Sequence, residues 1–209
     1  VTYSGQAAAP DLPGNFTWNS VKQSGGAVSD DSVKLLSDGV TETAVGISIT
    51  GGSLGSWSQA ADQEQVVIGD LMVDYLSINQ SDDEFDTGVS MTVNGVISGL
   101  VAGGLYDLFL YGQGDNHHDT DGAGWQNAGF TVGGETQQTQ WDLNVGGNGL
   151  LWEGYEFVKF EGIAADGDGN IAFDAFNPNT DSGDVDGNPS KWAGINGLQL
   201  VGEFTPVPE

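Results

Sequence analysis

The sequence predicts an all-β protein, a single antiparallel β-sandwich of jelly-roll type with little helix. Short segments repeatedly alternate apolar and polar residues, which is the period of a half-buried strand. The chain also contains 34 Gly, nine Phe, six Trp and five Tyr, a composition typical of short strands joined by tight turns. A length of 209 residues suits one sandwich. We place this domain at 1–202, followed by an extended C-terminal tail at 203–209.

The expected strands follow from this alternation. Apolar residues recur at every second position in three segments, 45–49, 89–93 and 171–173. Segment 106–111 is apolar on both faces apart from Asp107, as a central strand should be, and segment 192–201 reads as a closing strand bent at its glycines. Further strand candidates are 16–21, 129–132 and 155–160. The predicted core contains Val45, Ile47, Ile49, Val89, Met91, Val93, Leu108, Leu110, Ile171 and Phe173.

Helical spacing is found mainly in segment 65–78, where Ile68, Leu71, Met72 and Tyr75 would share one face. Because Gly69 weakens a helix, we expect at most one short helix there. Tight turns are expected where Asn, Asp or Ser adjoins Gly, at 37–39, 94–95 and 121–122.

The charge of the chain excludes several classes of partner. There are 30 Asp and Glu against four Lys and no Arg, which gives a formal net charge of -26. Nucleic acid is excluded as a partner because few cations are available to replace phosphate counterions, and phosphorylated substrates are disfavoured because no Arg fork is present. No apolar run approaches the length of a membrane span, so no membrane insertion is expected in this form. The absence of Cys excludes disulfides and Cys-based metal sites.

Two loops have the pattern D-x-D-x-N, which brings alternate side-chain oxygens to one side of a turn, as a hard cation requires. They consist of Asp166, Asp168 and Asn170, and of Asp184, Asp186 and Asn188. Neither loop continues as an EF-hand, so a calcium ion would also need backbone carbonyls or a remote carboxylate such as Asp174 or Asp181. The alternative is that both loops are simply good turn sequences. We expect structural Ca²⁺ in at least one of them.

The two histidines, His117 and His118, lie beside Asp119 and Asp121. Imidazole suits zinc, but the chain offers no third nitrogen ligand. A solvated loop, or a calcium site built on Asp119 and Asp121, is therefore favoured over a zinc site.

Three tryptophans lie in polar loops, namely Trp57, Trp125 and Trp152. An exposed indole stacks on sugar rings, while neighbouring amides and carboxylates bind hydroxyl groups. The alternative for each residue is that it covers an edge of the sandwich. Trp18 and Trp192 follow strand patterns and are expected in the core.

No sequence pattern indicates catalysis. Among 30 carboxylates some pair always exists, so their presence does not identify a glycosidase. No Gly-x-Ser-x-Gly elbow occurs for a serine triad. We therefore predict that the protein is not an enzyme.

Three segments together resemble the PEP-CTERM class of exported bacterial proteins, which an exosortase sorts. They are the terminus 206–209 (PVPE), the preceding strand 194–201 (GINGLQLV), and 97–100 (ISGL) followed by 105–112 (LYDLFLYG). The family's following Pro, membrane helix and basic tail are missing after Glu209, which fits either removal of a sorting signal or a truncated chain. The resemblance implies export, a place at the cell surface or in extracellular matrix, and no enzymatic activity.

Two functions remain open at this point. The preferred one is a calcium-stabilised structural protein of the cell surface or matrix, self-associating or filament-forming, in which 1–14 or 203–209 adds to the sheet of another copy. The alternative is a module resembling carbohydrate-binding modules, which recognises an extracellular polysaccharide through Trp57, Trp125 or Trp152.

Overall fold

Antiparallel strands make up the fold. The computed structural model describes residues 2–5, 16–19, 21, 23–24, 26–30, 34–36, 40–51, 53–58, 74–79, 91–112, 127–140, 151–178 and 192–204. The largest sheet has seven strands in the order β13 (Glu135–Gln138), β12 (Gly129–Val132), β15 (Ile171–Phe176), β10 (Thr92–Ser98), β7 (Gly46–Thr50), β4 (Ala27–Asp30) and β3 (Gln23–Ser24).

Two three-stranded sheets and two hairpins complete the described strands. One sheet has the order β14 (Phe157–Ala164), β11 (Leu105–Tyr111) and β17 (Gly197–Val201), and the other β16 (Trp192–Ile195), β9 (Asp74–Asn79) and β8 (Ser53–Ser58). The hairpins pair β1 (Thr2–Gly5) with β2 (Phe16–Asn19), and β5 (Lys34–Leu35) with β6 (Glu42–Thr43). Helices are absent from the described residues, which therefore offer no apolar helix long enough to span a membrane.

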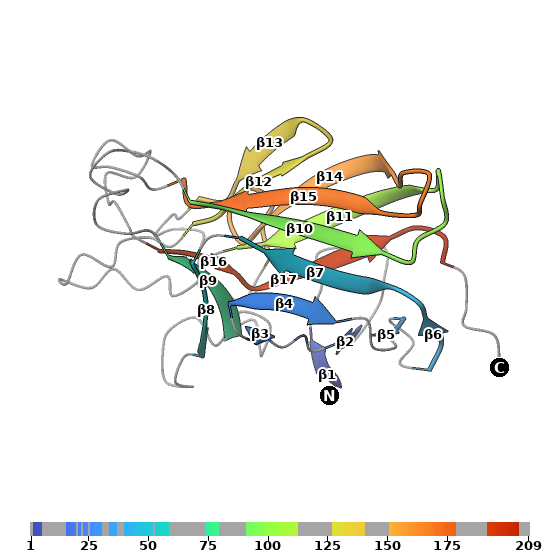
Figure 1. Ribbon diagram of the computed structural model, residues 1–209, viewed down its shortest axis with the longest axis horizontal. Coiled ribbons are helices and arrows are strands. Elements are labelled where there is room, and N and C mark those ends of the chain that lie inside the picture. The colour runs from blue at the N-terminus through green and yellow to red at the C-terminus, as the bar shows by residue number, and fades with distance from the viewer. Residues whose placement is uncertain are drawn as a thin grey trace.

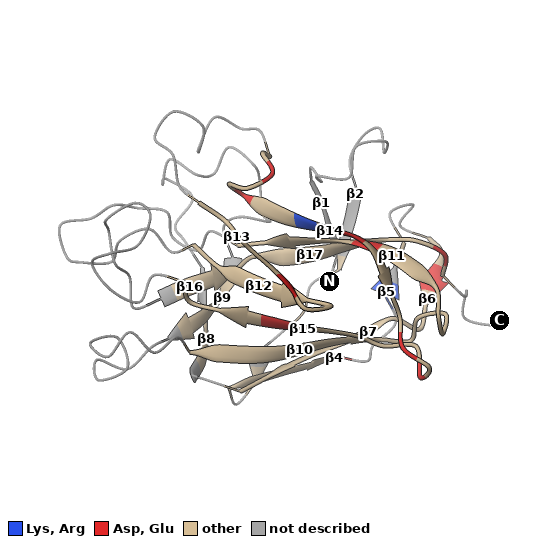
Figure 2. Ribbon diagram, turned by 90° about the horizontal axis from the view of Figure 1, so that it is seen from above, with Lys and Arg blue, Asp and Glu red and all other residues tan. Residues whose placement is uncertain are grey.

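The seven-stranded sheet and the β14-β11-β17 sheet form two layers around one core (Figures 1 and 2). Buried side chains from both layers belong to the same apolar cluster, so the predicted antiparallel sandwich is confirmed. Six predicted core residues are buried, namely Ile49, Val93, Leu108, Leu110, Ile171 and Phe173. Val45, Ile47 and Met91 are partly buried against the cluster, and Val89 lies outside the described residues.

Two local expectations are contradicted, the helix only over its last residues and the turn at 94–95 completely. Residues 74–78 of the expected helix belong to β9, which is paired on both sides, with β8 and with β16; residues 65–73 lie outside the described residues. Strand β9 pairs along both edges and contains Tyr75 and Ile78, residue types that favour strands. These factors outweigh the helical spacing of its apolar side chains. The expected turn at 94–95 lies inside β10. A Cβ at Gly95 would overlap the Phe173 ring, so this glycine makes room for a core aromatic.

The expected closing strand is divided into two strands, and the division falls at Asn196 and not at a glycine. Asn196 separates β16 from β17, and its N–H donates to the carbonyl of Tyr111 at 2.9 Å. Because β16 pairs with β9 whereas β17 pairs with β11, this short segment connects two sheets.

The beginning of the C-terminal tail packs against the sandwich. The hydroxyl of Tyr106 donates to the carbonyl of Glu203 at 2.7 Å and accepts the N–H of Val101 at 2.9 Å. The rings of Tyr106 and Phe204 lie 5.7 Å apart between centroids. Residues 205–209 lie outside the described residues, so the division into 1–202 and 203–209 stays a prediction.

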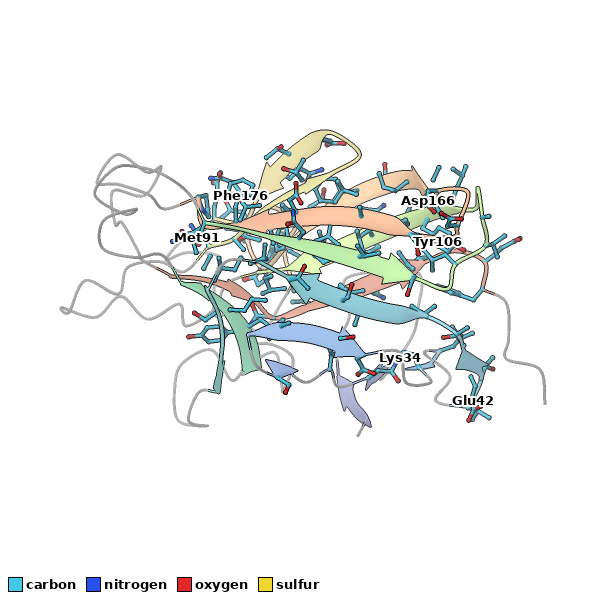
Figure 3. All side chains as sticks on the ribbon, viewed as in Figure 1. Lys34, Glu42, Met91, Tyr106, Asp166 and Phe176 are labelled. Carbon is cyan, nitrogen blue, oxygen red and sulfur yellow. The ribbon has the colours of Figure 1, made fainter. Side chains whose placement is uncertain are left out.

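The sandwich has two ends with different connections. We call one the Trp152 end; there the N–H of Gly112 donates to the carbonyl of Glu156 at 3.2 Å and that of Asn177 to the carbonyl of Met91 at 3.3 Å. We call the other the Asp166 end; there the turns 99–104 and 165–170 meet. Figure 3 shows Met91 and Phe176 at the first end and Tyr106 and Asp166 at the second.

Candidate functional site

Trp152 is an exposed aromatic residue on a closed turn. Its residue surface is 46% accessible. The carbonyl of Trp152 accepts the N–H groups of Tyr155 and Glu156, both at 3.1 Å, while the N–H of Trp152 donates to the Glu156 Oε2 at 2.8 Å. Trp152 and Glu156 therefore bond to each other in both directions, which fixes the backbone beneath the indole.

Neighbouring strand ends hold this turn in place. The N–H of Gln140, just after β13, donates to the carbonyl of Gly154 at 2.9 Å. The N–H of Gly112, just after β11, bonds the carbonyl of Glu156, and the Thr139 hydroxyl donates to the carbonyl of Gly112. The backbone that carries Trp152 is thus ordered before any ligand arrives, which lowers the entropic cost of binding.

Glu156 is a buried carboxyl group beneath Trp152. The residue is 1% accessible, and its Oε1 atom has no hydrogen-bond partner. Burial raises the pKa of Glu156, and the hydrogen bond from the Trp152 N–H opposes part of this rise. Sequence reasoning did not single out Glu156. The available signal was a carboxylate directly before the apolar pair Phe157 and Val158 that begins β14.

The first predicted calcium loop is a tight turn at the other end. Asp166 Oδ1 accepts the N–H groups of Asp168 at 2.9 Å and Asn170 at 2.8 Å. These hydrogen bonds, chiefly the one from Asn170, hold the pKa of the Asp166 carboxyl below its ordinary value. The Gly169 carbonyl accepts the N–H of Leu100 at 3.0 Å. Such hydrogen bonds are typical of a tight turn. A simple turn was the alternative to a calcium site for this loop.

Most other predicted site residues lie outside the described residues. They are Asp119, Asp121, Trp125, Asp184, Asp186 and Asn188. Trp57 lies in β8, where its backbone pairs with Tyr75, and its side chain is not among those described. Within the described ranges, no three His, Asp or Glu side chains are grouped to hold a metal ion.

Calcium therefore stays a prediction, which thermal melts can test. We expect the midpoint to be higher in millimolar Ca²⁺ than in chelator, because an ion bound to the folded form stabilises it by about 2.7 kcal/mol at 100 times its dissociation constant. Asp186→Ala removes the calcium-specific gain if 184–188 holds the ion, and Asp168→Ala removes it if 166–170 does. Melts in NaCl of matched ionic strength control for screening, and equal midpoints in calcium and chelator would contradict the assignment.

Comparison with known proteins leaves the family of this chain open. No family model matches it, and no curated protein does. Among solved structures, the chain is similar to TmCBM61 in complex with β-1,4-galactotriose, with 12% sequence identity and a TM-score of 0.39, over 75% of this chain and 88% of that chain.

Proposed function

We propose that this protein is a non-catalytic polysaccharide-binding domain in which the indole of Trp152 stacks on a sugar ring. The supporting observation is the exposed indole on a backbone fixed through Glu156, Gln140 and Gly112. A pyranose ring has an apolar face of C–H groups that suits an aromatic surface.

The glycan in this proposal is uncharged. Lys34 pairs with Asp30 at 2.9 Å, and Lys159 pairs with Asp107 and Glu161, so both described lysines already neutralise carboxylates of this chain. With a net charge of -26, the protein repels uronic acids and sulfated sugars.

Binding assays with soluble polysaccharides test the proposal. Affinity electrophoresis and calorimetry would use galactan, xylan, mannan and mixed-linkage glucan, with polygalacturonate as the acidic comparison. Trp152→Ala should weaken binding of the neutral glycan at least about tenfold, as expected for an aromatic contact at the centre of an interface. Leu105→Ala, which changes a residue of 65% accessibility at the Asp166 end, should leave binding unchanged. Equal affinities of wild type and Trp152→Ala, or no binding of any neutral glycan, would refute it.

Self-association remains the second candidate, with export to the cell surface or matrix as the setting of either function. Residues 1–14 were expected to add to the sheet of another copy. Within this segment, Thr2–Gly5 (β1) pairs instead with β2 of the same chain. The first tail residues, Glu203 and Phe204, pack on Tyr106. These contacts favour polysaccharide binding as the first proposal. Sedimentation of the wild type and of chains lacking 1–14 or 205–209 tests assembly through the termini.

A further inference from the structure

The outer face of the seven-stranded sheet carries one row of polar side chains. The strand registers pair Thr136 with Thr131, Thr131 with Asp174, Asp174 with Asn94, and Asn94 with Thr50. We call these residues the polar row. It crosses β13, β12, β15, β10 and β7, and with neighbouring strands about 4.8 Å apart it is about 19 Å long. Thr50, Asn94, Thr131 and Asp174 face away from the core, because each follows or precedes a buried core residue along its strand. Thr136 lies on the same face because it pairs directly with Thr131.

Hydrogen bonds order the row and leave it with capacity for a ligand. The Asn94 Nδ2 donates to Asp174 Oδ1 at 2.7 Å, and the hydroxyls of Thr131 and Thr136 share a bond of 2.9 Å. Both bonds are exposed. An amide has a second N–H, and a carboxylate has further lone pairs, so the Asn94–Asp174 pair can donate to one hydroxyl of a ligand and accept from another.

Phe176 lies beside the row. It is two residues from Asp174 on the same face of β15, and it is partly exposed. A Cβ at Gly129 would overlap the Phe176 ring, so the ring lies over the backbone of β12, next to Thr131. The result is an aromatic surface adjacent to hydroxyl, amide and carboxylate groups, the combination that binds sugars.

Charge favours a neutral ligand over a second copy of the chain as the occupant of this face. Among the outward positions of the five strands that form the row, Asp174 is the one charged residue, although the chain has 30 acidic residues. Figure 2 shows β7 and β10 free of charged residues and an acidic position in β15. A neutral polymer meets no repulsion there, whereas two chains of net charge -26 would repel each other.

We propose that an extended neutral polysaccharide lies across the strands along the polar row, with its central sugars beside Phe176. This inference rests on the proposed function and adds a second contact surface to Trp152. One inter-strand spacing is close to the length of one sugar residue, so the row accommodates about four sugars. Affinity should therefore increase with oligosaccharide length until the row is filled.

The test uses hexaoses and disaccharides of β-1,4-linked galactose, xylose, mannose and glucose. Asn94→Ala and Thr131→Val each remove polar groups of the row, and each should weaken hexaose binding about tenfold. Ser98→Ala, on the same face of β10 but away from the row, is the matched control. Circular dichroism melts report whether each variant is folded. In ¹⁵N spectra of the wild type, which require no substitution, the hexaose should shift the amides of 94, 131 and 174, and the disaccharide should bind at least about tenfold more weakly.

The outcomes distinguish this inference from the proposed function. If Trp152→Ala abolishes binding while Asn94→Ala and Thr131→Val bind like the wild type, the row is not a binding surface and the Trp152 site stands. If the row variants lose binding and Trp152→Ala does not, the row is supported and the Trp152 site is refuted. Failure of all hexaoses to bind overturns both. A wild-type dimer that Asn94→Ala dissociates would show that a second copy covers the face, which also overturns the inference.

Discussion

Replacing Gly169 by alanine is expected to lower the free energy of unfolding by about 3 kcal/mol. Gly169 has a φ of +76°, and a left-handed backbone costs a residue with a Cβ about 1–2 kcal/mol. The added Cβ would also overlap the carbonyl oxygen of Leu100, a backbone atom that cannot rotate away. Overpacking of this kind adds about 1–3 kcal/mol. Urea denaturation followed by circular dichroism measures the difference.

Gly167, in the same turn, provides the control. A Cβ there would meet open space, and Gly167 is not among the positive-φ glycines. Gly167→Ala should therefore change stability by no more than about 0.5 kcal/mol. If the two variants were equally stable, the turn that joins β14 to β15 would differ from the one described.

The second large effect is expected at Glu156, where the difference in stability between Glu156→Gln and the wild type should widen as the pH rises. Burial raises the pKa of this carboxyl above the ordinary value of 4.5. Above pH 4.5 the unfolded chain loses this proton while the folded protein still holds it, so the wild type loses stability as the pH rises through the folded pKa. Glutamine does not ionise, and its carbonyl can still accept the Trp152 N–H. The stability of the Glu156→Gln variant therefore does not fall for this reason as the pH rises.

Urea denaturation between pH 4 and pH 8 tests this expectation. The many other carboxylates also titrate in this range, so only the difference between variant and wild type is informative. Glu153→Gln is the matched control, because it removes the same formal charge from an exposed residue of the same turn. Parallel pH profiles for Glu156→Gln and the wild type would contradict the burial of an ionisable group at this position.

Much of the fold could be predicted from local pattern, because alternation reports which face of a strand is buried. Val93, Ile171 and Phe173 were assigned to the core on this basis and are buried. The expected helix at 65–78 and the expected turn at 94–95 show the limit of such reasoning. In both cases the outcome depends on partners distant in the chain: β8 and β16 on either side of β9, and the Phe173 ring against Gly95.

The candidate sites could be predicted only in part, for the same reason. Trp152 was recognisable because an indole in a polar segment is unusual. The polar row was not, since Thr50, Asn94, Thr131 and Asp174 are unremarkable polar residues until the strand registers place them side by side. Glu156 was equally inconspicuous, because its burial depends on strand ends that lie far away in the sequence.

The position of Phe204 determines how the protein can be mounted for measurement. The chain passes Tyr106 at the Asp166 end, and the five residues after Phe204 can extend at most about 17 Å. A biosensor chip or bead coupled behind residue 209 would therefore hold the molecule by the end remote from Trp152. The indole would then face the solution, with its access to long polymers unobstructed by the support. Coupling through lysine amines would fix the orientation less well, because Lys34 and Lys159 lie on different sheets.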